Sequence, residues 1–153
     1  MKNILLFTLL SFSAITLANA QQNALGLRLG FYYGGVAEAS FQHYLSELNR
    51  VEINLGLDTS NAIHVTGAYQ WVFDLSQLEQ GFKWYAGVGG GAYIGKNARI
   101  GILGNLGIEY TFEFPLQLSL DIRPIFYLNR LSDDPDDHRF RHGGGALGVR
   151  YKF

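Results

Sequence analysis

The last twelve residues, His142–Phe153, read HGGGALGVRYKF, and they decide the fold. Counted back from the end in steps of two, Phe153, Tyr151, Val149 and Leu147 are all large and apolar. The residues between them are charged or small. A β-strand sends alternate side chains to opposite faces. The stretch is therefore expected to be a strand with one apolar face and one face of polar or small residues.

The same alternation recurs along most of the chain. It is clearest in residues 50–58, where Val51, Ile53, Leu55 and Leu57 alternate with polar residues or glycine. Seven strands are predicted ahead of the closing one, over residues 24–33, 36–45, 50–58, 62–73, 82–95, 99–112 and 116–128. Pro124 lies inside the last of these and cannot donate to a sheet ladder, so we expect a bulge there. The pattern predicts an all-β protein, an eight-stranded antiparallel up-and-down barrel.

The two faces of the strands indicate which side points outward. The apolar face is bulky throughout, whereas the other face consists mostly of glycine, alanine, serine, asparagine and threonine with a few charges. The interior of an eight-stranded barrel is only just wide enough for side chains to fill. The bulky face is therefore expected outside, in lipid, with aromatic residues near the strand ends as interfacial girdles. The alternative is a soluble, periplasmic lipocalin-like carrier with its apolar face inside.

The first twenty residues have the pattern of a cleaved secretory signal. A positive Lys2 precedes an apolar run, and Ala18-Asn19-Ala20 forms an A-x-A cleavage site. The chain thus divides into a signal peptide, residues 1–20, and a barrel domain, residues 21–153. No later segment has the ~20 consecutive apolar residues of a membrane helix. The expected location is the bacterial outer membrane.

Composition excludes some classes of partner and of stabilising bond. The formal net charge is −1, which argues against nucleic acid as a partner. The chain has no cysteine, so no disulfide can stabilise it after export. A closed barrel in lipid needs none, because its backbone hydrogen bonds are all satisfied internally.

Three stretches carry a resemblance to a known family: WYAGVGGGAYIG (84–95), GNLGIEYTFEFPLQLSLDIRP (104–124) and the terminal GVRYKF. They resemble the small OmpA/OmpX-type outer-membrane barrels, and in particular the short barrels of Bacteroidetes-like genomes. In that family, a terminal Phe preceded by apolar residues at alternate positions is the membrane-insertion signal. The resemblance assigns this role to Val149, Tyr151 and Phe153. It implies contact with the barrel-assembly machinery through the last strand and with outer-membrane lipid and lipopolysaccharide. It implies no cofactor and no assigned activity.

The polar face carries charges that a filled lumen must neutralise, because buried charges need partners. We predict an internal ion-pair network of Arg28, Glu38, Glu52, Glu109, Asp121, Arg123 and Arg150. Such a network can be a structural filling of the lumen or a gated polar pore. Eight strands leave no aqueous channel, which favours the filling.

The segment between the last two predicted strands, residues 129–141, is the most highly charged. It is expected at the outer surface, and its candidate contact residues are Asp133, Asp134, Asp136, Asp137 and His138. Clustered oxygen ligands can hold Ca²⁺, but the spacing is not that of a D-x-[DN]-x-[DN]-G loop. We therefore expect a solvated surface loop and no metal site.

An enzyme is the remaining alternative, since some small outer-membrane barrels modify lipid A. His64 and His142 lie near the predicted outer rim, with Asp58, Thr59 and Ser60 nearby, and could supply a nucleophile and a base. The sequence has no H-x-S-N motif and offers no apolar pocket for an acyl chain. We expect no enzyme and no cofactor, and a structural or surface-interaction role in the envelope.

Overall fold

The computed structural model describes residues 22–31, 35–95, 98–129 and 140–153 of the chain. The predicted signal peptide and the acidic segment Asp133–His138 lie outside these residues. The described residues form ten β-segments: β1 (Asn23–Gly30), β2 (Val36–Tyr44), β3 (Asn49–Asp58), β4 (Ile63–Asp74), β5 (Phe82–Ile94), β6 (Ala98–Thr111), β7 (Leu116–Ile122), β8 (Ile125–Tyr127), β9 (Phe140–Arg141) and β10 (Gly145–Lys152).

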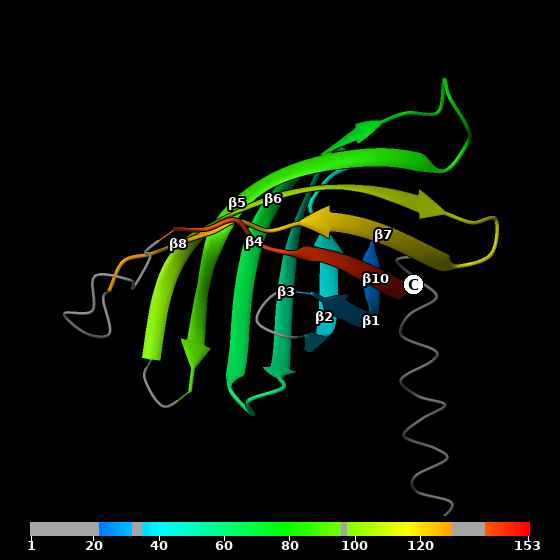
Figure 1. Cartoon of the computed structure of the whole chain (residues 1–153). Helices are drawn as coiled ribbons and strands as arrows, with labels where there is room; N and C mark the ends of the chain where they lie inside the picture. Colours follow the sequence, from blue (N-terminus) through cyan, green and yellow to red (C-terminus); the bar gives the residue numbers. More distant parts are fainter. Residues whose placement is uncertain (1–21, 32–34, 96–97, 130–139) are drawn as a thin grey trace, which may run out of the picture.

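These segments make a closed antiparallel barrel of eight strands. β7 and β8 continue one strand, since both pair with β6 in one register, with Leu106 opposite Ile122 and Leu103 opposite Ile125. β9 and β10 follow each other as the neighbouring strand. β1 pairs with β2 on one side and with β10 on the other, so the first and last strands lie side by side and close the sheet (Figure 1). The predicted strand number and topology are confirmed.

The two faces of the sheet differ as the alternation predicts. In β1, Leu27 is 65% exposed and points away from the lumen, whereas its neighbour Arg28 is 0% exposed. The same contrast continues around the barrel, with leucine, isoleucine, valine and aromatic side chains outside and polar or small side chains inside. The barrel is thus apolar on its surface and polar in its interior.

The interruption at Pro124 differs from the prediction. The ladder breaks at Arg123 and Pro124, but the β6 side keeps its register, and the Pro124 carbonyl accepts a hydrogen bond from the Gly104 N–H at 2.9 Å. The extra residue lies in the opposite strand. Ile122 pairs with Gly145 and Ile125 with Arg141, so residues 142–144 face only residues 123–124. The predicted bulge is therefore real but misplaced. It forms where the facing strand can bend, because a glycine is available there.

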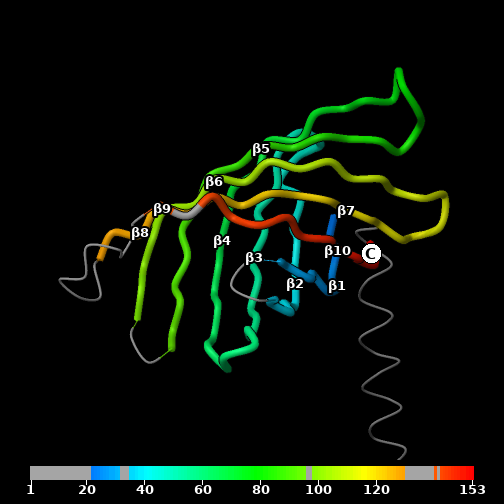
Figure 2. The backbone as a smooth tube through the Cα atoms, viewed as in Figure 1, coloured from blue at the N-terminus to red at the C-terminus, as the bar shows by residue number. Residues whose placement is uncertain are grey.

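Gly143 makes this irregularity possible. Its φ is 65°, in the left-handed region that favours glycine. A Cβ atom on Gly143 would lie 2.1 Å from the Arg123 carbonyl oxygen, a backbone atom that cannot easily move. Figure 2 shows the two strands following one another closely through this region, with β9 and β10 beside β8 and β7.

We expect Gly143→Ala to lower the free energy of unfolding by roughly 2 kcal/mol, because it adds a left-handed backbone penalty to a backbone contact. Gly145→Ala is the matched control, since a Cβ there meets nothing within 4 Å. The measurement is urea unfolding of the protein refolded in a non-ionic detergent. Equal midpoints for the two variants would contradict the assignment of the extra residue to Gly143.

Candidate functional site: the charged lumen

The interior of the barrel gathers the polar side chains of every long strand. All seven residues of the predicted network lie there, each no more than 5% exposed. The structure adds Arg50, which is 0% exposed. The network therefore has four arginines and four carboxylates, and its charges balance; Arg99 and Asp58 are buried as well, nearer the opposite barrel end. The residues of the network are Arg28, Arg50, Arg123, Arg150, Glu38, Glu52, Glu109 and Asp121.

Arg28 organises the first group of contacts. Its Nε lies 3.2 Å from Asp121 Oδ2 and its Nη2 bonds the other oxygen of the same carboxylate, which makes a two-pronged contact between β1 and β7. Its Nη1 lies 2.5 Å from Glu38 Oε2 on β2. The Tyr85 hydroxyl donates to Asp121 Oδ2 at 3.1 Å. Bidentate arginine–carboxylate contacts are among the stronger and more directional ion pairs. This group connects strands from both sides of the barrel.

A glycine provides the space for this group. A Cβ atom on Gly107 would lie 2.5 Å from Tyr85 Cζ and 2.7 Å from Asp121 Cβ. The small residues of the inward face are therefore the room into which the long charged side chains fold.

Glu52 is the centre of the second group. One of its oxygens, Oε1, lies 2.6 Å from Arg123 Nη2 and accepts from Asn54 Nδ2 at 3.0 Å. The other, Oε2, accepts from Gln42 Nε2 at 2.6 Å and lies 3.3 Å from Arg150 Nη2. These donors replace the water that the carboxylate loses on burial. They remove most of the free-energy cost of burying it.

Each arginine beside Glu52 also bonds a neighbouring hydroxyl group. Arg150 donates from Nε to Ser40 Oγ at 2.9 Å and from Nη1 to Ser119 Oγ at 2.7 Å. Arg123 donates from Nη1 to Thr66 Oγ1 at 3.0 Å. The guanidinium groups are thus held from several strands at once.

The third group was not predicted. Arg50 Nη1 lies 2.6 Å from Glu109 Oε2 and donates to the Tyr44 hydroxyl at 2.7 Å, while the Tyr44 hydroxyl donates to Glu109 Oε1 at 3.1 Å. The Arg50 guanidinium also stacks over the Tyr85 ring, 4.5 Å from its centre. Arg50 is missing from the predicted network because it begins its predicted strand. Its place in the alternation, on the same face as Glu52, was the signal that could have found it.

The two histidines that suggested a catalytic set have different surroundings. Asp58 Oδ1 accepts from the Ser60 N–H at 2.8 Å and the Ser60 hydroxyl at 2.7 Å, and Asp58 Oδ2 lies 3.3 Å from His64 Nε2. This carboxylate closes the β3–β4 turn. His142, between β9 and β10, is exposed, and its ring lies 5.3 Å from that of Phe140.

Within the described part of the chain, no three histidine, cysteine or acidic side chains come together in a way that could hold a metal ion. Within the same residues, no helix has the length and apolar character needed to cross a membrane.

Comparison with known proteins defines the fold. No protein-family model matches the sequence, and no curated protein sequence matches it. Among solved structures, the chain is similar to the crystal structure of the N-terminal β-barrel domain of Pseudomonas aeruginosa OprF. The TM-score is 0.69 at 14% identity, covering 88% of this chain and 100% of that one. The two proteins share a fold. That fold is a closed eight-stranded antiparallel barrel, which confirms the predicted fold class.

We expect the Arg28–Asp121 contact to show strong coupling in a double-mutant cycle. Arg28→Met and Asp121→Asn should each lower the free energy of unfolding by about 3–5 kcal/mol, because each leaves a buried charge without its partner. The double variant should lose less than the sum, by ~1 kcal/mol or more.

Asp74→Asn combined with Arg28→Met is the control cycle. Asp74 lies at the exposed end of β4 and accepts hydrogen bonds from Ser76. Its effect should add to that of Arg28→Met within about 0.5 kcal/mol. Simple additivity in the Arg28–Asp121 cycle would show that the two residues act independently.

Proposed function

We propose that this chain is a small outer-membrane β-barrel of a Gram-negative envelope with a structural or surface-interaction role and no catalytic activity. The observation that carries the proposal is the reversed distribution of polarity. Buried arginines and buried carboxylates, five of each among the described residues, fill the interior, while large apolar side chains cover the outside. In water this arrangement would expose the apolar surface and bury the charges, and both are unfavourable. In lipid, the apolar surface is the solvated one.

The aromatic side chains support the same location. Rings are in contact around the barrel end that holds the β4–β5 and β6–β7 turns. Phe73 stacks on Trp84 with ring centres 4.1 Å apart, and Phe112 contacts Tyr110 at 4.8 Å and Phe114 at 5.1 Å. Amphipathic and aromatic rings concentrate at the level of lipid headgroups. This end is therefore proposed to lie at the periplasmic interface, with the end that holds the β3–β4 turn on the cell exterior.

A structural role accords with the contents of the lumen. Each described arginine–carboxylate group links strands that are far apart in the sequence, such as β1 with β7 and β3 with β6. These contacts occupy the space that a substrate would need. We therefore propose that the lumen stabilises the barrel, and that contacts with other molecules occur at its ends and through lipid and lipopolysaccharide at its surface.

The closing strand is proposed to carry the signal for assembly. Val149 and Tyr151 of β10 point outward, at 42% and 57% exposure, and Phe153 follows directly. Their use by the barrel-assembly machinery stays a prediction, as does the narrower resemblance to barrels of Bacteroidetes-like genomes.

We expect the expressed protein to fractionate with the outer membrane and to change its gel mobility on heating. A closed barrel resists SDS until it is heated, because its backbone hydrogen bonds are mutually supporting and no strand edge is free. The measurement compares boiled and unboiled outer-membrane fractions by SDS gel electrophoresis. Recovery of the protein in the soluble periplasmic fraction, without a mobility shift, would overturn the proposed location.

A charge on the outward face tests the same proposal in another way. Leu27→Arg should make folding into lipid vesicles less favourable by roughly 2–4 kcal/mol, because the guanidinium must enter hydrocarbon. Gln77→Arg, in the exposed β4–β5 turn, is the control and should change little. If Leu27→Arg folded into vesicles as favourably as Gln77→Arg, the outward face would not be the lipid-facing one.

A further inference from the structure

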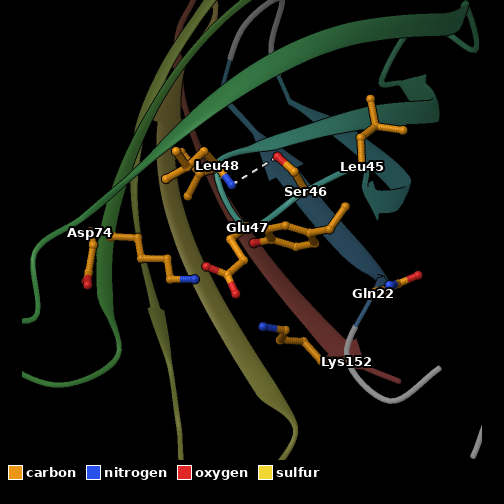
Figure 3. Close-up of a pocket in the computed structure, with 10 residues that line it drawn as sticks. Gln22, Leu45, Ser46, Glu47, Leu48, Asp74 and Lys152 are labelled. Atoms are coloured by element: carbon orange, nitrogen blue, oxygen red, sulfur yellow. Dashed lines mark hydrogen bonds between the residues drawn. The ribbon is translucent and has the colours of Figure 1, made fainter.

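A hollow of about 640 Å³ lies at the end of the barrel where the β2–β3 turn and the end of β10 meet (Figure 3). None of the eight charged residues of the ion-pair network lines it, but Tyr44, which bonds two of them, does. The Tyr44 hydroxyl bonds Arg50 and Glu109 in the lumen, and its ring faces the hollow. These two hydrogen bonds fix the ring, so the floor of the hollow is preorganised.

Two lysines approach the Tyr44 ring from different strands. Lys83 Nζ of β5 lies 5.8 Å from the ring centre, and Lys152 Nζ of β10 lies 5.4 Å from it. Within the described part of the chain, neither lysine forms an ion pair. Two carboxylates lie opposite Lys83 in the strand pairing, Glu109 on β6 and Asp74 on β4. Glu109 is already bonded by Arg50 and Tyr44. The network of the lumen is balanced without these lysines, so their charges lie outside it, at the opening.

Negative charge lines the same space. Glu47 of the β2–β3 turn lines the hollow and forms no ion pair with any described residue. Asp74, at the end of β4 and opposite Lys83 in the strand pairing, is held by the Ser76 N–H at 2.8 Å and the Ser76 hydroxyl at 2.9 Å. Figure 3 shows Glu47, Lys152 and Asp74 around the hollow. Opposite charges thus surround one space without joining into ion pairs with each other.

We propose that this hollow binds a small zwitterion. Its anionic group, a phosphate or a carboxylate, is held between Lys83 and Lys152, and its ammonium group is directed toward Glu47. The apolar side chains of Leu45, Leu48 and Val72 line the rest of the space and suit a short carbon chain between the two charges. A simple anion fits less well, because Glu47 and Asp74 repel additional negative charge. A simple cation also fits less well, because the two lysines repel additional positive charge.

The same chemistry occurs in a free molecule such as phosphoethanolamine and in the headgroup of phosphatidylethanolamine. The two sources differ in whether acyl chains are attached. The hollow lies at a barrel end, so either source can reach it. The binding test needs only the folded protein in a non-ionic detergent, so its result is independent of the proposed membrane location.

The first experiment is isothermal titration of the folded mature chain with phosphoethanolamine, inorganic phosphate and ethanolamine in separate runs. We expect phosphoethanolamine to bind more tightly than either fragment. Soluble glycerophosphoethanolamine and dilauroyl phosphatidylethanolamine in the same micelles then distinguish the sources. Tighter binding of the lipid assigns the site to a headgroup, and equal or weaker binding assigns it to a soluble zwitterion. Failure of phosphoethanolamine to bind better than phosphate would overturn the proposal.

Variants then test the two lysines and Glu47 separately. Lys83→Gln combined with Lys152→Gln should weaken phosphoethanolamine binding by about ten-fold or more. Glu47→Gln should leave phosphate binding unchanged or tighter and abolish the preference for the zwitterion. Glu79→Gln, in the exposed β4–β5 turn and outside the hollow, is the matched control for Glu47→Gln. Unchanged affinity in both hollow variants would overturn the assignment.

A second measurement on the unaltered chain guards against variants that do not fold. Reductive ¹³C-methylation labels the lysine amines for nuclear magnetic resonance. On titration with phosphoethanolamine the signals of Lys83 and Lys152 should shift. Lys96, which lies between β5 and β6 in the sequence, is the internal control. Shifts absent from Lys83 and Lys152 would contradict binding at this hollow.

Discussion

Closure of the sheet between β1 and β10 is the constraint on which the rest of the structure depends. Their ladder runs from Ala24 opposite Lys152 to Gly30 opposite Ala146. Once it forms, the first and last strands both have neighbours, and the edge that would otherwise bind another chain disappears. Closure also creates an inside. Every inward side chain must then fit a narrow space, and every charge there must find a partner within it.

The lumen meets this demand by combining large charged side chains with very small ones. Arg28, Glu52 and Arg50 each organise a group of contacts, the groups are linked to one another, and glycines such as Gly107 leave the space that they occupy. The outside has no comparable requirement for precision. Leu27 and its outward neighbours need only be apolar and large enough to cover the backbone. The information in the sequence is therefore concentrated on the inward face, where a substitution affects several partners at once.

The pairing of charges inside the lumen does not continue to the barrel end with the β2–β3 turn. Inside, the arginines and carboxylates neutralise one another. At the opening, Lys83, Lys152 and Glu47 form no ion pairs among the described residues, although they line one hollow. Glu47 is exposed and the two lysines are half-buried, so water still reaches these charges, and such an opening can keep them available for another molecule. Tyr44 joins the two regions, with its hydroxyl in the network and its ring at the opening.

The sequence by itself determined the strand number, the direction of each face and the identity of seven network residues. All of these follow from an alternation of period two, a local property of the backbone that survives in any β-sheet. The sequence did not determine which carboxylate each arginine contacts, or that Arg50 belongs to the ion-pair network. Nor did it determine that the extra residue opposite Pro124 lies at Gly143. Those features depend on register and on the way the barrel closes. Arg28 and Asp121 are 93 residues apart, and only closure brings β1 and β7 to opposite sides of the same narrow space. The hollow at the Tyr44 ring likewise exists only in three dimensions, because its walls come from five different strands and turns that no local pattern connects.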